Sequence, residues 1–269
     1  MDKAVLRRFN VHVTGGGPRT LMFAHGFGCD QQMWRFVAPR FEADHRVVLF
    51  DYLGMGNADR ATYDPRRYGE LDAYAEDLIE IGRSLELRDA ILVGHSASGM
   101  IGALASIRAP GLFSHLVMIG PSPCYLEDGD YHGGFARADL EGLLEMMGHN
   151  DLGWAAFLAP VVMQNAERPE LGAELHNSFC ATDPVVARRF AEATFFGDNR
   201  ADLARVPVPS LILQCAQDNI APGHVGDYLH AHLPDSRLHR LSATGHCPHM
   251  SHPEETTAAI RAYLRDVVG

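Results

Sequence analysis

One short segment, residues 90–101 with the sequence AILVGHSASGMI, constrains the fold of this chain more than any other. Its first four residues are apolar, as in a buried strand, and Ser96 follows between small residues just before a helical pattern begins. A serine on such a tight turn is typical of a nucleophile elbow, whose strained backbone leaves no room for bulky neighbours. Gly94 and Gly99 meet this requirement, although Ser98 stands where the short G-x-S-x-G pattern needs its last glycine. The alternative is an ordinary strand-to-helix turn with a solvated serine.

Short apolar runs alternate with helical patterns along much of the chain, which is typical of an α/β protein with a largely parallel sheet. We expect strands in residues 21–24, 46–50, 90–93, 116–119, 210–215 and 238–241, and helices in residues 71–85, from residue 100 onward and in residues 253–268. The GGGP cluster at residues 15–18 predicts a hairpin turn between two N-terminal strands. The expected core is a mostly parallel sheet flanked by helices.

The alternation stops between residues 123 and 203, where only helical patterns appear, in residues 140–147, 153–162, 169–179 and 184–196. We therefore expect a core formed by residues 1–122 and 204–269, interrupted by a helical cap at residues 123–203. Large aromatic residues are frequent in the cap. Some of them should pack onto the core, while others should line an apolar cavity above Ser96. The predicted cavity wall consists of Phe27, Phe135, Trp154, Phe157 and Phe195.

A serine hydroxyl needs a base to accept its proton, and the base needs a group that holds its tautomer. Asp218 lies just after the apolar run at residues 210–215, and His246 follows the last predicted strand. The order Ser, Asp, His along the chain is the one expected for an α/β-hydrolase arrangement, in which all three residues sit at the carboxyl ends of strands. We therefore predict a catalytic triad of Ser96, Asp218 and His246.

Other residues compete for the two partner roles. His249 and His252 lie close behind His246, but the nearby prolines at 248 and 253 place them in a turn and at a helix entry. His95 should face away from the site if Ser96 faces into it. Asp51 follows a predicted strand and is a second candidate acid, although its glycine-containing neighbours favour a loop at the rim of the site.

The tetrahedral intermediate of such a reaction needs hydrogen-bond donors for its oxyanion, and backbone amides usually supply them. The segment HGFG at residues 25–28 directly follows a predicted strand, and Ala97 opens the helix after the elbow. We therefore predict an oxyanion hole formed by the amides of Phe27 and Ala97. The alternative for residues 25–28 is a simple glycine turn.

Composition and motifs exclude several other functions. A formal net charge of −11 opposes binding to nucleic acid or to anionic lipid. The five scattered cysteines predict free thiols in a reducing compartment, and the absence of a signal peptide or spanning segment predicts a cytoplasmic protein. The DYLGMG segment at residues 51–56 lacks the third glycine of a dinucleotide site. We expect no cofactor, no metal ion, no nucleic-acid partner and no membrane association.

Several segments resemble the α/β-hydrolase family that contains the bacterial stress-response regulator RsbQ and the plant karrikin and strigolactone receptors. The matching stretches are residues 25–31, 94–102, 105–108, 112–114, 130–135 and 245–251, and the RsbQ branch is most similar at residues 120–126 and 209–215. Ser98, which breaks the short elbow motif, is familiar in this family. The resemblance implies an α/β-hydrolase fold with a mostly parallel, eight-stranded sheet and a four-helix cap. It also implies an apolar pocket with a narrow entrance and a triad at Ser96, His246 and Asp218.

The resemblance also implies two kinds of function, and the sequence does not separate them. The leading prediction is a serine hydrolase that cleaves a small, largely apolar ester or lactone through an acyl-enzyme, with water completing the cycle. The alternative is a signalling module that senses or produces a small ligand and activates a partner phosphatase carrying a sensing domain. A haloperoxidase-like or lyase use of the same triad is a third possibility, because fold does not determine reaction.

Overall fold

The computed structural model describes residues 2–148 and 153–268. Within these residues the sheet has seven strands in the order β1-β3-β2-β4-β5-β6-β7, so the prediction of eight strands is one too many. All neighbouring pairs are parallel except β1 with β3. The strands are β1 (His12–Thr14), β2 (Arg19–Ala24), β3 (His45–Leu49), β4 (Ala90–His95), β5 (Phe113–Ile119), β6 (Ser210–Gln217) and β7 (Ser236–Thr244).

The N-terminal hairpin predicted at residues 15–18 is wrong. Strand β1 pairs antiparallel with β3 rather than with β2, and His12 lies opposite Leu49 in this register. The glycine-rich turn therefore carries the chain past β3 to a position one strand further into the sheet. The turn residues predicted a change of direction correctly, but the partner of an edge strand depends on contacts far away in the sequence.

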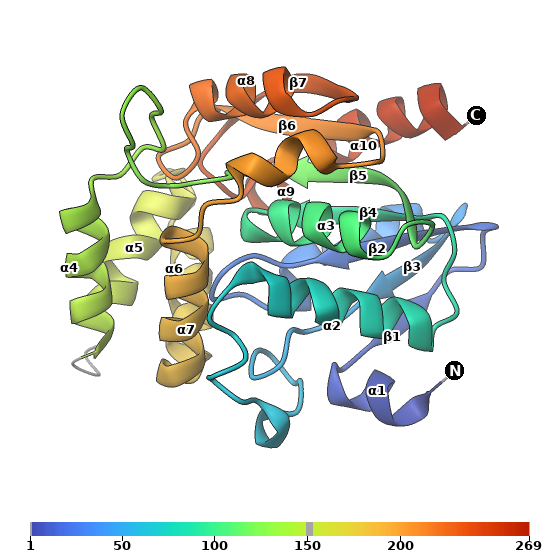
Figure 1. The fold of residues 1–269 in the computed structure, drawn as a ribbon, viewed down its shortest axis with the longest axis horizontal. Helices are drawn as coiled ribbons and strands as arrows, with labels where there is room; N and C mark the ends of the chain where they lie inside the picture. The colour runs from blue at the N-terminus through green and yellow to red at the C-terminus, as the bar shows by residue number, and fades with distance from the viewer. Residues whose placement is uncertain (1, 149–152, 269) are drawn as a thin grey trace.

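Helices cover the sheet, and their placement follows from their apolar faces. The amphipathic helix α2 packs against α3, which follows the elbow (Figure 1). The helices predicted in residues 71–85 and 253–268 are confirmed as α2 and α10. The core helices are α1 (Lys3–Arg8), α2 (Leu71–Ser84), α3 (Ala97–Arg108), α8 (Gly223–His232), α9 (Pro248–Ser251) and α10 (Pro253–Val268), with 3₁₀ turns η1 (Gln31–Trp34), η2 (Ala38–Phe41), η3 (Arg60–Thr62) and η4 (Arg200–Arg205).

Among the described residues, four α-helices lie between β5 and β6 in the chain, in the stretch where four helical patterns were predicted. They are α4 (Arg137–Gly148), α5 (Gly153–Met163), α6 (Pro169–Ala181) and α7 (Pro184–Phe195). They gather on one side of the sheet (Figure 1). A bidentate ion pair joins Glu174 of α6 to Arg35, and the Ser178 hydroxyl donates to the carbonyl oxygen of Gly28. These contacts hold α6 over the loop that follows β2.

Two further features bear on the predictions from sequence. All five cysteines are free thiols, as predicted. No helix in residues 2–148 and 153–268 combines the length and the apolar character that crossing a bilayer requires.

Candidate active site

The nucleophile elbow is built from the end of β4 and the start of α3. Ser96 has a φ of +57°, which is costly for a residue with a Cβ, and its amide donates to the carbonyl oxygen of Ile119 at 2.8 Å. Gly94 is required nearby, because a Cβ at that position would lie 2.4 Å from the backbone oxygen of Ser98. The local sequence thus folds into a strained turn that presents the Ser96 hydroxyl at the carboxyl edge of the sheet.

Two loops bring an acid and an imidazole to this hydroxyl. Nε2 of His246 lies 2.8 Å from Oγ of Ser96, and Nδ1 of His246 lies 2.8 Å from Oδ2 of Asp218. All three side chains are buried. Asp218 follows β6 and His246 follows β7, so their convergence results from the parallel sheet, whose strands end at one edge.

The hydrogen bonds of Asp218 determine which nitrogen of His246 carries the ring proton and which nitrogen accepts from Ser96. Its Oδ1 accepts from the amides of Ile220 and Ala221 at 2.8 and 3.0 Å. Burial opposes ionisation of Asp218, but the neighbouring His246 and these amides outweigh it, so the pKa of this carboxyl lies below its usual value. A carboxylate only accepts hydrogen bonds, so Nδ1 of His246 donates to Asp218. Nε2 is then left to accept from Ser96.

The two segments that carry the predicted oxyanion amides lie beside the nucleophile. Ala97 is the first residue of α3, so its N–H has no partner within the helix. The loop carrying Phe27 passes beside the nucleophile, because a Cβ on Gly26 would lie 3.3 Å from the Cβ of Ser96.

Ser98 and Tyr52 brace this loop, a role that sequence reasoning missed. The Ser98 hydroxyl donates to the His25 carbonyl oxygen at 2.6 Å and lies 2.9 Å from the Tyr52 hydroxyl. The Tyr52 amide donates to Nε2 of His25 at 3.1 Å. The serine that interrupts the G-x-S-x-G pattern thus ties the start of α3 to the loop after β2. The departure from that pattern was the signal that could have found it.

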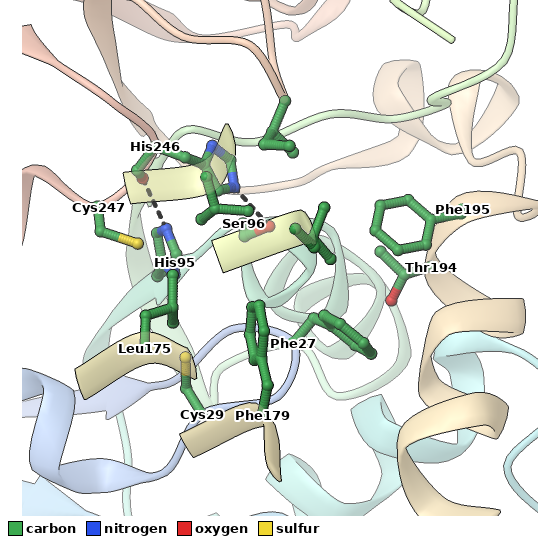
Figure 2. Close-up of a pocket in the computed structure, with 13 residues that line it drawn as sticks. Phe27, Cys29, His95, Ser96, Leu175, Phe179, Thr194, Phe195, His246 and Cys247 are labelled. Carbon is green, nitrogen blue, oxygen red and sulfur yellow. Dashed lines mark hydrogen bonds between the residues drawn. The ribbon is translucent and has the colours of Figure 1, made fainter. Parts of the chain in front are cut away.

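A small, largely apolar cavity of about 20 Å³ lies beside Ser96 and His246. Figure 2 shows aromatic and aliphatic side chains from the loop after β2 and from helices α6 and α7 around the two polar residues. The lining residues are Phe27, Cys29, His95, Ser96, Leu158, Val162, Leu175, Phe179, Thr194, Phe195, Ile220, His246 and Cys247. The character of this lining suits a ligand that is mostly apolar.

The predicted wall residues divide into three groups. Phe27 and Phe195 line the cavity, and their ring centroids are 5.8 Å apart. Trp154 is buried behind the lining and stacks on Phe179 at 5.3 Å, while Phe135 is half-buried and contacts Phe195 from outside the lining. Phe157 does not belong to the wall, because 61% of its side chain is exposed on the outer face of α5.

A tyrosine outside the predicted set also reaches the nucleophile. The Tyr125 hydroxyl lies 3.3 Å from Oγ of Ser96, and the side chain is buried. Tyr125 belongs to the segment after β5, where the sequence showed no strand or helix pattern. Only the folded chain places it here.

The alternative residues take supporting positions. Asp51 is buried and accepts hydrogen bonds from the amides of Gln31 and Asn57 and from the Asn10 side chain, so it braces loops. His252 follows the short helix α9. His95 does not turn fully away, because it lines the cavity and its Nε2 donates to the carbonyl oxygen of His246 at 2.8 Å (Figure 2). Burial lowers the pKa of His95 to about 3, which leaves it neutral.

One group of side chains in residues 2–148 and 153–268 has the composition of a metal site. Nitrogen or sulfur atoms of His95, Cys247 and His249 lie within 4.8 Å of one another. However, Nε2 of His95 is already bonded to the His246 carbonyl, and Nδ1 lies 2.6 Å from where a Cβ on Gly26 would be. Binding an ion through Nε2 would break the contact behind His246, and Nδ1, which has no hydrogen-bond partner among the described residues, is crowded by the Gly26 backbone, so the donor set fits a metal poorly.

The fold and the arrangement at the elbow define an α/β-hydrolase. The sequence pattern of the alpha/beta hydrolase family matches residues 21–260, and this chain belongs to that family. It is 38% identical to the strigolactone esterase D14 of Arabidopsis thaliana over 97% of both chains. It is 37% identical to a karrikin insensitive 2 receptor of Petunia hybrida over 91% of both. A hydrolase from Oleispira antarctica has a similar structure, with a TM-score of 0.95 and 44% identity over 97% of this chain and 96% of that one.

Proposed function

We propose that this protein is a serine hydrolase that cleaves a small, largely apolar ester or lactone. The observation that carries the proposal is the unbroken chain of 2.8 Å contacts from Ser96 through His246 to Asp218 at the edge of an apolar cavity. The similarity to a relative named as a strigolactone esterase supports the same class of reaction.

The proposed reaction has two halves. Ser96 attacks the substrate carbonyl while His246 accepts the serine proton and then returns it to the leaving alcohol. Asp218 holds the imidazole in the required tautomer, and the amides of Phe27 and Ala97 stabilise the oxyanion. In the second half, His246 activates a water molecule that releases the acyl group from Ser96. None of these steps requires a cofactor or a metal ion.

The cavity supports a restricted class of substrates. Its lining is aromatic and aliphatic apart from a few polar groups, which include the hydroxyls of Ser96 and Thr194. Burial against Phe27, Phe179 and Leu158 would favour an apolar acyl or lactone body, because removing apolar surface from water drives binding. Within this proposal residues 123–203 act as the cap that completes the site over the core.

A second candidate is a signalling module, and the similarity to a protein named as a karrikin receptor favours it. In this function, slow hydrolysis would generate or sense a ligand, and the ligand-bound state would activate a partner phosphatase with a sensing domain, as the resemblance to RsbQ implies. Both functions are consistent with a cytoplasmic protein that has free thiols. A neighbouring gene for such a phosphatase would favour the second.

Hydrolysis of p-nitrophenyl acetate by purified variants tests the proposed function. We expect Ser96→Ala to reduce kcat/KM by at least about a thousandfold, because the nucleophile is lost. Ser106→Ala is a matched control: it removes a buried hydroxyl from the same helix, where Ser106 only donates to the Ala103 carbonyl oxygen. Equal rates for Ser96→Ala and the wild type would exclude the serine mechanism.

A further inference from the structure

The Tyr125 hydroxyl is a second polar group at the nucleophile. It lies 3.3 Å from Oγ of Ser96, and the Tyr125 ring meets the cavity residue Phe195 edge to face at 5.3 Å. The backbone is also held in place, since the Tyr125 carbonyl oxygen accepts from the amide of Phe135 at 3.1 Å. The hydroxyl is therefore fixed beside the reacting oxygen by packing and by the backbone.

The direction of this hydrogen bond follows from the other contacts. Nδ1 of His246 donates to Asp218, so Nε2 accepts the only proton of the Ser96 hydroxyl. Oγ of Ser96 then has only lone pairs left for Tyr125, and Tyr125 must be the donor. Burial raises the pKa of Tyr125 above its usual value, which keeps this donor protonated.

A donor at this oxygen affects the two halves of the proposed reaction in opposite directions. During acylation Oγ of Ser96 uses a lone pair to bond to the carbonyl carbon, so a hydrogen bond from Tyr125 stabilises the free serine and opposes attack. In the acyl-enzyme the same atom is an ester oxygen, which is a weaker acceptor. During deacylation the carbon–Oγ bond breaks, and Oγ takes the electron pair and then the proton that His246 returns. A donor held at Oγ stabilises this departing oxygen.

We propose that Tyr125 promotes deacylation by donating a hydrogen bond to Oγ of Ser96 as this oxygen leaves the acyl group. The inference rests on the proposed hydrolase function and adds a group that governs how long the acyl-enzyme persists. Tyr125 thereby limits the fraction of enzyme held in the acylated state.

The test measures the acylated fraction of Tyr125→Phe directly. The variant is mixed with p-nitrophenyl acetate, quenched during steady turnover, and examined by intact-protein mass spectrometry alongside stopped-flow release of p-nitrophenol. We expect deacylation to slow by about three- to tenfold, the effect of losing one hydrogen bond, with acylation unchanged or faster. The ratio of acylated to free enzyme should therefore rise at least about threefold.

Tyr131→Phe is the matched control. Tyr131 lies in the same segment and is also buried, but its hydroxyl donates to the carbonyl oxygen of Cys124 at 2.8 Å and not to Ser96. This variant should keep the wild-type ratio of acylated to free enzyme. Thermal unfolding of both variants establishes that each is folded under the assay conditions.

The outcomes separate this inference from the function on which it rests. An unchanged ratio in Tyr125→Phe, or equal slowing of both half-reactions, would overturn the role of Tyr125 while leaving the hydrolase intact. Equal rates of p-nitrophenyl acetate hydrolysis by the wild type and Ser96→Ala would overturn the hydrolase function itself. A raised ratio in Tyr131→Phe as well would trace the effect to the fold of this segment, and the role of Tyr125 would again be overturned.

Discussion

Replacing Asp218 with asparagine tests the proposed role of the acid through the tautomer of His246. Oδ1 of Asp218 accepts from two backbone amides, of Ile220 and Ala221, whereas Oδ2 accepts from Nδ1 of His246. An asparagine side chain has one acceptor oxygen and one NH₂ donor. Its oxygen should keep the two amides, because the opposite orientation would point NH₂ at two N–H groups. The NH₂ group would then face Nδ1.

This orientation of the asparagine reverses the tautomer of the His246 imidazole. Nδ1 of His246 would have to accept from the asparagine, so the ring proton would move to Nε2 and no lone pair would remain to receive the Ser96 proton. We expect kcat to fall about 10⁴-fold. That loss corresponds to about 5 kcal/mol of transition-state stabilisation. The volume of the side chain is unchanged, so the variant should fold, and steady-state hydrolysis of p-nitrophenyl acetate measures the effect.

Asp51→Asn is the matched control for Asp218→Asn. Asp51 is also a buried carboxyl after a strand, and it accepts from the backbone amides of Gln31 and Asn57 and from Asn10 instead of a histidine. Loss of the Asp51 carboxylate should lower the midpoint temperature of unfolding. It should leave kcat within about threefold of the wild-type value, since the lost hydrogen bonds lie outside the triad. The reasoning fails if Asp218→Asn retains more than about a tenth of the wild-type kcat, or if Asp51→Asn loses as much activity.

Two further predictions concern stability and the cavity wall. His249 is buried, packs against Trp34 with the ring centroids 4.6 Å apart and the rings tilted, and has no hydrogen-bond partner for either ring nitrogen among the described residues. Burial lowers the pKa of His249, so only the unfolded chain binds its proton below the usual value of 6.5, and this residue makes stability fall as pH falls. The free energy of unfolding should fall by about 1.4 kcal/mol per pH unit below about pH 6 because of this residue, and His249→Leu should remove that fall. Urea unfolding of the wild type and the variant at pH 7 and pH 5 measures it. If the variant shows the same difference in stability between the two pH values as the wild type, the assignment is contradicted. Phe195→Ala should destabilise the fold by about 3–5 kcal/mol and raise KM, whereas Phe157→Ala should change stability by less than about 0.5 kcal/mol and leave KM alone; equal effects of the two substitutions would contradict the assignment of the wall.

The cavity wall shows where prediction from the sequence reached its limit. Trp154 and Phe157 are three residues apart on α5, yet the first is 5% exposed and the second 61%. The residues of α5 are themselves apolar on nearly all faces of the helix, so the periodicity of its sequence does not indicate which face is buried. The rotation of this helix depends on its neighbours, and α6 contributes the Phe179 ring on which Trp154 stacks.

The sequence by itself determined the elbow at Ser96, the candidate triad in the chain order Ser96, Asp218, His246, and the α/β architecture. These features depend on a few neighbouring residues or on the rule that parallel strands end at one edge. Only the tertiary structure decided that β1 pairs with β3, that Phe157 faces outward and that the Tyr125 hydroxyl meets Ser96. Each of these depends on contacts between segments distant in the chain, where packing of whole elements selects one arrangement among several that the local sequence allows equally.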